Sequence, residues 1–340
     1  MPSSNRLACL IVLAALCALV REALAQTDPL PSWNDGAAKT AIVDFVNATT
    51  TEGSPQFVPP AARVATFDQD GTLWVEKPMY SQVIYCLDRV PAVVKAKPEL
   101  AQVEPFKTVM SGNRDAIARL SRQDLEKILA ATLTGMSVDE FRAQVAKWLD
   151  TARDPRWKRP YTELTYLPMR EVLDYLRSNG YRTYIVTGGG QDFVRVYAER
   201  VYGIPPEQVV GTAGGTRYGY AKDGKPFLTK EPKLLLNDDN AGKPEGIHLM
   251  IGRRRPVAAF GNSTGDREML EYTKAGDGMR LAMIVLHDDA AREYAYGPAH
   301  GLPNSTVGTF TQALYGEATK DGWVIISMKN DWKHIFGWEP

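Results

Sequence analysis

The sequence has few cysteines, a balanced charge and no long internal hydrophobic run. Three cysteines in 340 residues are too few for a disulfide framework. Forty basic residues balance forty acidic ones, and a net charge of zero argues against binding an extended polyanion such as a nucleic acid. No internal stretch approaches the roughly 20 apolar residues of a membrane-spanning helix. With 44% hydrophobic and 24% charged residues, the composition is that of a globular protein of one large domain or two modest ones.

The N-terminal segment differs from the rest of the chain. Arg6 is followed by an apolar run at residues 7–20, and a small-x-small pattern at residues 23–25 precedes Gln26. This order predicts a signal peptide over residues 1–25, and therefore an exported protein that is periplasmic or secreted. An uncleaved anchor or a buried helix is the alternative, although the run is short for a membrane span.

Cleavage of that segment would change the cysteine count. Cys9 and Cys17 lie within it, so the exported chain would keep only Cys86. A single cysteine cannot form a disulfide within the chain, so stability would depend on core packing. After cleavage we expect no membrane association.

Short apolar segments alternate with helical patterns along the remaining chain. Residues 64–67, 184–186, 257–260 and 281–286 have the length and composition of buried strands. This alternation predicts an α/β fold, with a Rossmann-like parallel sheet and helices on both faces. We also expect helices at 36–46, 168–180, 191–202 and 243–253, a strand at 209–211, and a hairpin at 216–229 that turns at Asp223 and Gly224.

Residues 77–166, shortly after the first strand, have helical patterns almost throughout. A capping box at Ser137 begins one of these helices, and an apolar stripe continues along it. A long helical block between two strands of a parallel sheet predicts a separate, all-helical lobe. The expected division is a core of residues 26–76 and 167–340 with this insertion at 77–166.

Two carboxylates follow the first predicted strand. Asp68 and Asp70 are two residues apart and face roughly the same way, and Gly71 permits a sharp turn after them. Open parallel sheets bind ligands at the carboxyl ends of their strands. Like charges this close repel each other unless a cation joins them, and Mg²⁺ prefers oxygen ligands. An Asx turn or a helix cap is the alternative interpretation.

A hydroxyl and a run of glycines follow the strand at 184–186. Thr187 ends the strand, and the glycines from Gly188 onward would leave N–H groups open at the start of a helix, which suits an anion. A plain strand-to-helix turn is the alternative. The chain has neither Gly-x-Gly-x-x-Gly nor Gly-x-x-x-x-Gly-Lys-Ser/Thr, so a nucleotide-binding loop is not indicated.

Three segments together resemble the motifs of the haloacid dehalogenase superfamily. FDQDGTL at 67–73 resembles the first motif, VTGG at 186–189 the second and FGNSTGD at 260–266 the fourth, in the order of that family. The resemblance extends over residues 64–286. Within the superfamily, the chain is similar in particular to the phosphoserine-phosphatase-like branch. That branch inserts a helical cap between the first and second motifs, where residues 77–166 lie in this chain.

The resemblance implies roles for individual residues. Asp68 would attack phosphorus and form an aspartyl-phosphate, and Asp70 would protonate the leaving oxygen and then accept a proton from water. Thr187 and the Gly188 N–H would hold the transferring oxygens. Dehalogenating relatives lack the second aspartate, so Asp70 favours phosphoryl transfer over carbon–halogen cleavage.

A carboxylate that attacks a phosphate dianion requires nearby positive charge. At about 4 Å and an effective dielectric near 20, each pair of like charges repels by roughly 4 kcal/mol. By resemblance, Mg²⁺ would be held by Asp68, the Asp70 carbonyl, Asn262 and Asp266. Many relatives have Asp where this chain has Asn262, and an amide contributes no charge, so Asp266 would compensate directly or through water.

A lysine would add further positive charge. Lys243 and Lys233 both precede the fourth motif, and Lys243 is preferred because it begins a helix whose following strand carries that motif. Lys233 would lie after the hairpin, and either side chain could instead be a solvated surface lysine. Four further residues follow the first motif closely enough to reach the same cleft: Trp74, Glu76, Lys77 and Tyr80.

The sequence therefore predicts an exported, Mg²⁺-dependent phosphatase that acts on small phosphomonoesters and has no nucleic-acid partner. A phosphotransferase on the same fold is one alternative, and a non-catalytic phosphate-ligand binding protein is another. The sequence does not identify the substrate.

Overall fold

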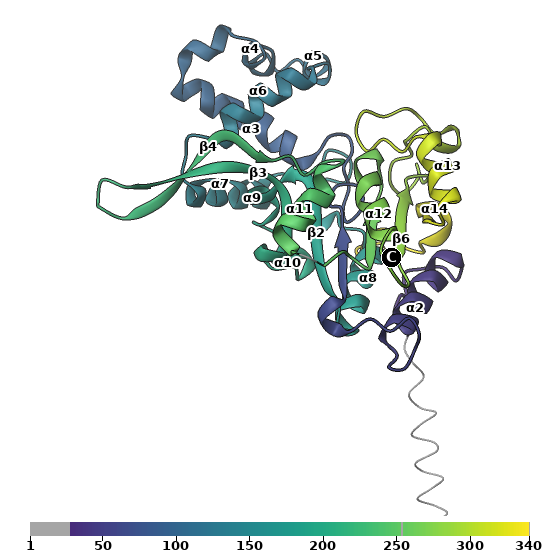
Figure 1. The fold of residues 1–340 in the computed structure, drawn as a ribbon. Coiled ribbons are helices and arrows are strands. Elements are labelled where there is room, and N and C mark those ends of the chain that lie inside the picture. Colours follow the sequence, from purple (N-terminus) through teal and green to yellow (C-terminus); the bar gives the residue numbers. More distant parts are fainter. Residues whose placement is uncertain (1–27, 253, 340) are drawn as a thin grey trace, which may run out of the picture.

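The computed structural model describes residues 28–252 and 254–339 (Figure 1). Within them, a seven-stranded sheet has the order β4-β3-β2-β1-β5-β6-β7. Its neighbouring strands pair in parallel, except for the antiparallel pair β3 and β4. The strands are β1 (Val64–Phe67), β2 (Arg182–Gly190), β3 (Val209–Tyr220), β4 (Pro226–Leu236), β5 (Ala258–Gly261), β6 (Leu281–Leu286) and β7 (Val324–Ser327). The predicted signal peptide at 1–25 lies outside the described residues.

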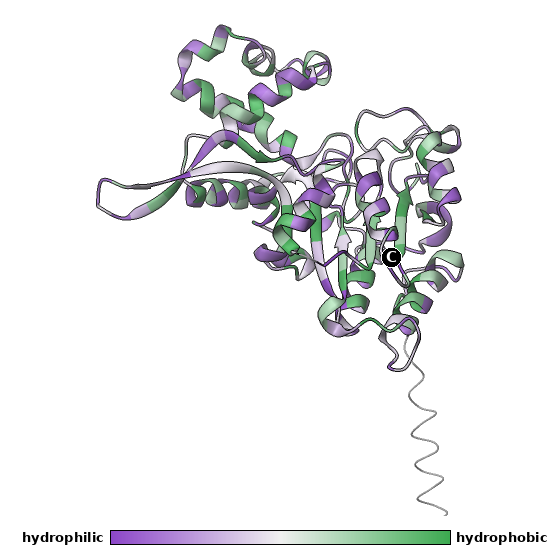
Figure 2. Ribbon diagram, viewed as in Figure 1, coloured by the Kyte–Doolittle hydropathy of each residue, from purple (hydrophilic) through white to green (hydrophobic). Residues whose placement is uncertain are grey.

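Helices cover both faces of the sheet, which confirms the predicted Rossmann-like α/β class. Alternate residues of β6 enter two apolar clusters: Met283 and Val285 pack with α2 and α8, whereas Ala282 and Ile284 pack with α11, α12 and α13. Figure 2 shows the central strands of the sheet as largely hydrophobic and the outer helix faces as hydrophilic. The helices are α2 (Ala37–Thr50), α3 (Ser81–Ala96), α4 (Phe106–Met110), α5 (Arg114–Ala118), α6 (Arg122–Leu133), α7 (Val138–Thr151), α8 (Leu167–Ser178), α9 (Gln191–Val194), α10 (Ala198–Tyr202), α11 (Gly242–Ile251), α12 (Arg267–Lys274), α13 (Gln312–Lys320) and α14 (Met328–Asp331).

The hairpin is longer than predicted and belongs to the main sheet. The strand expected at 209–211 and the first half of the hairpin expected at 216–229 form one continuous strand, β3. Its beginning pairs with β2, and its remainder pairs with β4 in an arm that extends beyond the sheet (Figure 1). The predicted turn is confirmed, since Ala221 N donates to Lys225 O at 2.8 Å and Gly224 has a φ of 80°.

The continuous helix expected at 191–202 is wrong. The chain forms the short helices α9 and α10, and between them Val196 N and Tyr197 N donate to carbonyls only three residues earlier. The glycines at 188–190 end β2, and Gly190 is the N-cap of α9. Their N–H groups are not all open as expected, since Gly189 N donates to Thr187 Oγ1 and Gly190 N donates to Gln82 Oε1.

The segment between β1 and α8 is helical, with α3 to α6 grouped beyond the carboxyl ends of the strands and α7 beside the hairpin (Figure 1). The loop before α7 forms backbone hydrogen bonds with β4: Gly135 N donates to Lys230 O, and Lys230 N donates to Met136 O, each at 2.9 Å. The Lys230 ammonium also forms an ion pair with Asp192 at the start of α9. The hairpin thus joins the helical segment to the sheet.

The C-terminal part of the chain completes the core. β7 extends the sheet beyond β6, and the sequence patterns did not indicate it. Trp332 and Phe336 of the final segment are buried, and the Trp332 ring packs edge-on against Trp33. No helix within the described residues has the length and apolar character needed to cross a membrane.

Candidate active site

The loop after β1 is a compact turn that holds two aspartates at the carboxyl edge of the sheet. Asp68 N donates to Phe260 O of β5 at 2.9 Å, which fixes the start of the loop. Gly71, with a φ of 80°, reverses the chain, and its N–H donates to Trp74 O. The Trp74 indole N–H then donates to Asp70 Oδ1 at 2.6 Å and fixes that carboxylate. Both predicted acidic residues thus lie in one rigid turn.

Lys243 lies beside the first aspartate. Its Nζ is 2.6 Å from Asp68 Oδ1 and 2.5 Å from Asp266 Oδ1, and it also donates to Val186 O in the middle of β2. The lysine is 2% exposed. Its position follows from its place in the first turn of α11, which lies over β2 and β3. Lys233, the alternative, is an exposed residue of β4.

Burial dominates the electrostatics of these groups. Burial and the Asp266 charge raise the pKa of Asp68 well above its usual value, against the effect of Lys243. Burial would lower the pKa of Lys243, but the Asp266 and Asp68 carboxylates raise it, so the lysine stays protonated. Burial also raises the pKa of Asp70 to about 6, although the Trp74 hydrogen bond opposes the shift. One ammonium is therefore too little positive charge for this carboxylate cluster.

Thr187 and the glycines after it form the second side of the site. Thr187 is buried, and its Oγ1 accepts a hydrogen bond from Gly189 N at 3.0 Å. Gly190 N donates to Gln82 Oε1 of α3 at 2.6 Å. Gly188 is exposed and lines the cavity. The glycine run thus contacts the helical insertion through a hydrogen bond. The helix that follows the run, α9, has only four residues, so its N-terminus is not that of an extended helix.

The fourth segment places Asn262 and Asp266 next to the first turn. Asp266 Oδ2 accepts from the backbone N–H groups of Asn262 and Ser263, each at 2.9 Å, while Oδ1 accepts from Lys243. Both oxygens of Asp266 therefore have partners. The Asn262 side chain accepts from the Thr72 hydroxyl at 3.2 Å and donates from Nδ2 to Glu76 at 2.8 Å.

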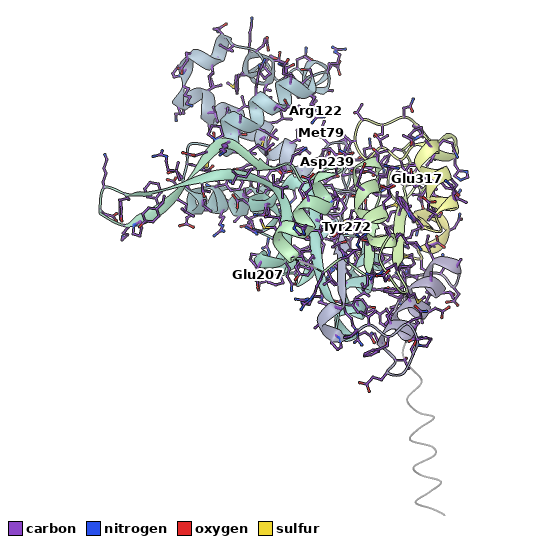
Figure 3. All side chains as sticks on the ribbon, viewed as in Figure 1. Met79, Arg122, Glu207, Asp239, Tyr272 and Glu317 are labelled. Carbon is purple, nitrogen blue, oxygen red and sulfur yellow. The ribbon has the colours of Figure 1, made fainter. Side chains whose placement is uncertain are left out.

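A cavity of about 260 Å³ brings most of these residues together. Its wall contains five carboxylates, and among the described lining residues Lys243 is the single cation; the acids are Asp68, Asp70, Glu76, Asp239 and Asp266. Tyr80, Gln82, Val83 and Leu129 line it from the helical insertion. In Figure 3, Asp239 on the core side lies below Met79 and Arg122 of the insertion.

The donor set in and beside this cavity fits a hard cation. The predicted ligands, Asp68, the Asp70 carbonyl, Asn262 and Asp266, each have an oxygen atom to offer, and the carboxylate excess of the cavity needs a positive partner. Across residues 28–252 and 254–339, no group of three or more His, Cys, Asp or Glu side chains is placed to hold a metal ion. A metal site here would therefore depend on the carbonyl and amide oxygens as well as on carboxylates.

The sequence did not indicate several residues around the first turn. His287 Nε2 donates to Gly71 O at 2.8 Å, with its other ring nitrogen beside the Glu293 carboxylate, and Tyr296 OH donates to Glu76 at 2.7 Å. These residues come from the loop after β6, far from the first motif in sequence. Only long-range contacts, and no local pattern, could have found them.

The fold and the site define a Rossmann-like α/β protein with an acidic loop after its first strand. The family model of haloacid dehalogenase-like hydrolases matches residues 65–271, and the chain belongs to this family. The matched range contains Asp68, Thr187, Lys243 and Asp266. No curated protein matches the sequence.

Three solved structures show the range of structural similarity. A protein of unknown function from Bordetella pertussis Tohama I has 16% identity and a TM-score of 0.49, covering 78% of this chain and 97% of that chain. Cytosolic 5′-nucleotidase IIIB bound to cytidine has 11% identity and a TM-score of 0.43, covering 85% and 84%. A substrate-bound phosphoserine phosphatase complex has 17% identity and a TM-score of 0.33, covering 66% and 85%.

Proposed function

We propose that this protein is an exported, Mg²⁺-dependent phosphatase that hydrolyses small phosphomonoesters through an aspartyl-phosphate. The observation that carries the proposal is the contact of Lys243 with Asp68 and Asp266, beside an Asp70 carboxylate that Trp74 holds in place. Family membership supports a hydrolase, and this arrangement supplies a nucleophile, an acid–base group and a fixed cation.

Asp68 is the nucleophile in this mechanism. Its carboxylate oxygen attacks phosphorus, the bond to the leaving oxygen breaks, and water later releases phosphate from the aspartyl group. Lys243, always protonated, offsets part of the repulsion between this carboxylate and the substrate. Mg²⁺, which Asp68, the Asp70 carbonyl, Asn262 and Asp266 would hold, would add the remaining positive charge and keep Asp68 ionised.

Asp70 transfers the proton. A pKa of about 6 lets its carboxyl donate a proton to the leaving oxygen and then accept one from the attacking water near neutral pH. The Trp74 hydrogen bond leaves one carboxylate oxygen, Oδ2, facing the cavity side of the turn, where Gly189 also lies. Thr187 and Gly188 border the same space and would bind the transferring oxygens.

The cavity favours a small substrate. Its volume of about 260 Å³ lies below the range of roughly 300–1,000 Å³ that is typical of drug-sized ligands. Tyr80, Val83 and Leu129 of the helical insertion border it and would contact the leaving group. The helical segment would thus act as a cap that selects the substrate.

The test is phosphate release from a panel of small phosphomonoesters, with Mg²⁺ and with a chelator. Wild type should turn over at least one compound with Mg²⁺ only, and Asp68→Asn should be inactive. Asp139→Asn, at an exposed position of α7, is the control and should retain activity. Turnover that survives chelation or the Asp68→Asn change would overturn the mechanism, as would inactivity on every compound.

Two further measurements address the alternatives. Release of the alcohol without a matching amount of phosphate, when a second alcohol is added, would mean phosphoryl transfer rather than hydrolysis. Export is tested by the mass of the protein recovered outside the cytoplasm, which should correspond to a chain that begins at Gln26. A full-length chain retained in the cytoplasm would contradict export.

A further inference from the structure

A buried glutamate follows the catalytic turn and contacts the residue expected to bind the metal. Glu76 is 1% exposed, and its Oε1 accepts from Asn262 Nδ2 at 2.8 Å and from Tyr296 OH at 2.7 Å. Both donors are neutral, and the carboxylate forms no ion pair within the described residues. A buried carboxylate without a cation is costly, so its retention needs a reason.

The turn is built tightly around this pair. A Cβ added to Gly71 would lie 2.1 Å from Asn262 Nδ2 and 2.6 Å from Glu76 Oε1, so only glycine allows the turn to approach them. The Thr72 hydroxyl donates to the opposite side of the amide, at Asn262 Oδ1. Asn262 is thus held with its nitrogen toward the glutamate and its oxygen toward the first motif.

Glu76 faces the same cavity as the two aspartates of the first motif. Glu76 lines the cavity together with Asp68 and Asp70, whereas Asn262 is not among the described lining residues. Among the predicted ligands, Asn262 is a neutral amide, whereas Asp68 and Asp266 are carboxylates that both contact Lys243. Asn262 would therefore bring no negative charge of its own to the metal position.

We propose that Glu76 orients the Asn262 amide toward the metal position and supplies, next to it, the negative charge that the neutral amide lacks. The inference rests on the proposed Mg²⁺-dependent function. Glu76 acts as a positioning residue: its hydrogen bond to Nδ2 fixes the amide and increases the negative character of Oδ1. Carboxylates that hold a metal ligand in this way typically change metal affinity 10- to 100-fold when removed.

The test is Mg²⁺ binding to the purified protein, measured by calorimetry with MgCl₂ alone and no substrate. Glu76→Gln keeps the size of the side chain and should weaken binding about 10- to 100-fold. The double variant Glu76→Gln/Asn262→Asp transfers the negative charge from position 76 to its hydrogen-bond partner at position 262. Its Mg²⁺ affinity should lie within about threefold of that of wild type. Glu171→Gln, whose carboxylate contacts Ser32 rather than the cavity, is the control and should bind as wild type does.

Each result decides a different question. If wild type binds no Mg²⁺, the proposed function fails. If wild type and Glu76→Gln bind Mg²⁺ equally well, or the folded double variant does not recover affinity, the role of Glu76 alone is overturned. Thermal unfolding in chelator reports folding independently of metal. If Glu76→Gln does not fold, the double variant is decisive, and failure of both to fold would make Glu76 a structural residue and overturn the proposal.

Discussion

Lys243 Nζ lies 2.6 Å from Asp68 Oδ1, although 175 positions separate the two residues in the chain. The same ammonium contacts Asp266 at 2.5 Å, so one buried cation separates two buried carboxylates. This contact links the loop after β1 to α11 and to the segment after β5. It therefore contributes both to folding and to the site.

Lys243→Met should lower the free energy of unfolding and abolish phosphatase activity. Removing one partner of a buried ion pair leaves the other uncompensated, at a cost of about 3–5 kcal/mol. Denaturant unfolding in chelator measures the loss, and phosphate release measures activity. Lys233→Met, at an exposed position of β4, is the control and should change neither by much. A stability loss below about 1 kcal/mol would show that the contact is not maintained in solution.

Asp70→Asn should stabilise the metal-free protein at high pH. Burial raises the pKa of the Asp70 carboxyl to about 6, above its ordinary value of 3.8. The native state therefore holds this proton more tightly, and the group's contribution to stability is lost as pH rises through about 6. In chelator, the variant should unfold at a higher temperature than wild type at pH 8, with the gain shrinking toward pH 4.

Asp223→Asn is the control for that comparison. The Lys225 hydrogen bond lowers the pKa of Asp223, so the ionised form is favoured and its replacement should give no gain at pH 8. A gain for Asp70→Asn that is constant across the pH range would contradict titration of Asp70 as the cause.

Trp74→Phe should move the pH dependence of catalysis to higher pH. The indole N–H donates to Asp70 Oδ1 and lowers the pKa of that carboxyl, so its loss should raise the pKa further above 6. Asp70 must be protonated to act on the leaving oxygen, so the alkaline limb of kcat/KM should shift upward. Trp148→Phe, which removes an indole hydrogen bond to Asp88, is the control. A limb that stays in place or moves to lower pH would be inconsistent with this role.

Gly71→Ala should destabilise the protein much more than Gly224→Ala. Both glycines have a φ of 80°, so each substitution introduces backbone strain of about 1 kcal/mol. At Gly224 nothing lies within 4 Å of the added Cβ, whereas at Gly71 it would overlap Asn262 and Glu76. We expect a total loss of about 3 kcal/mol or more for Gly71→Ala. Denaturant unfolding of both variants checks this, and equal losses would contradict the close packing.

Local patterns predicted the centre of the sheet well. The buried strands at 64–67 and 281–286 have the observed bounds of β1 and β6, because short β-branched and apolar runs bounded by turns are distinctive. The patterns also indicated the residues that the structure brings together around Asp68, since the carboxyl ends of neighbouring parallel strands share one edge. The sequence pattern did not predict that the expected helix at 191–202 divides into α9 and α10. The tighter turn between them, with hydrogen bonds to carbonyls three residues earlier, has the same kinds of residues as a regular helix.

Other features depend on contacts distant in sequence. Glu76 and Asn262 are 186 positions apart, and nothing near either residue reveals that they form a hydrogen bond. β7 is short and pairs only with β6, so its four residues have no distinctive pattern without that neighbour. The continuity of β3 was also hidden, because its glycines and polar residues suggest a break where the strand instead bends from one partner to the next.

The hairpin bears on any attempt to divide or recombine this protein. β3 begins in the ladder beside Thr187, and β4 returns along the loop that precedes α7, through hydrogen bonds at Lys230. The helical insertion is therefore not a module attached by its two ends alone. An excised fragment of residues 77–166 would lose a backbone partner at Gly135 and Met136, and a chimera that exchanges this segment would need to carry the hairpin with it.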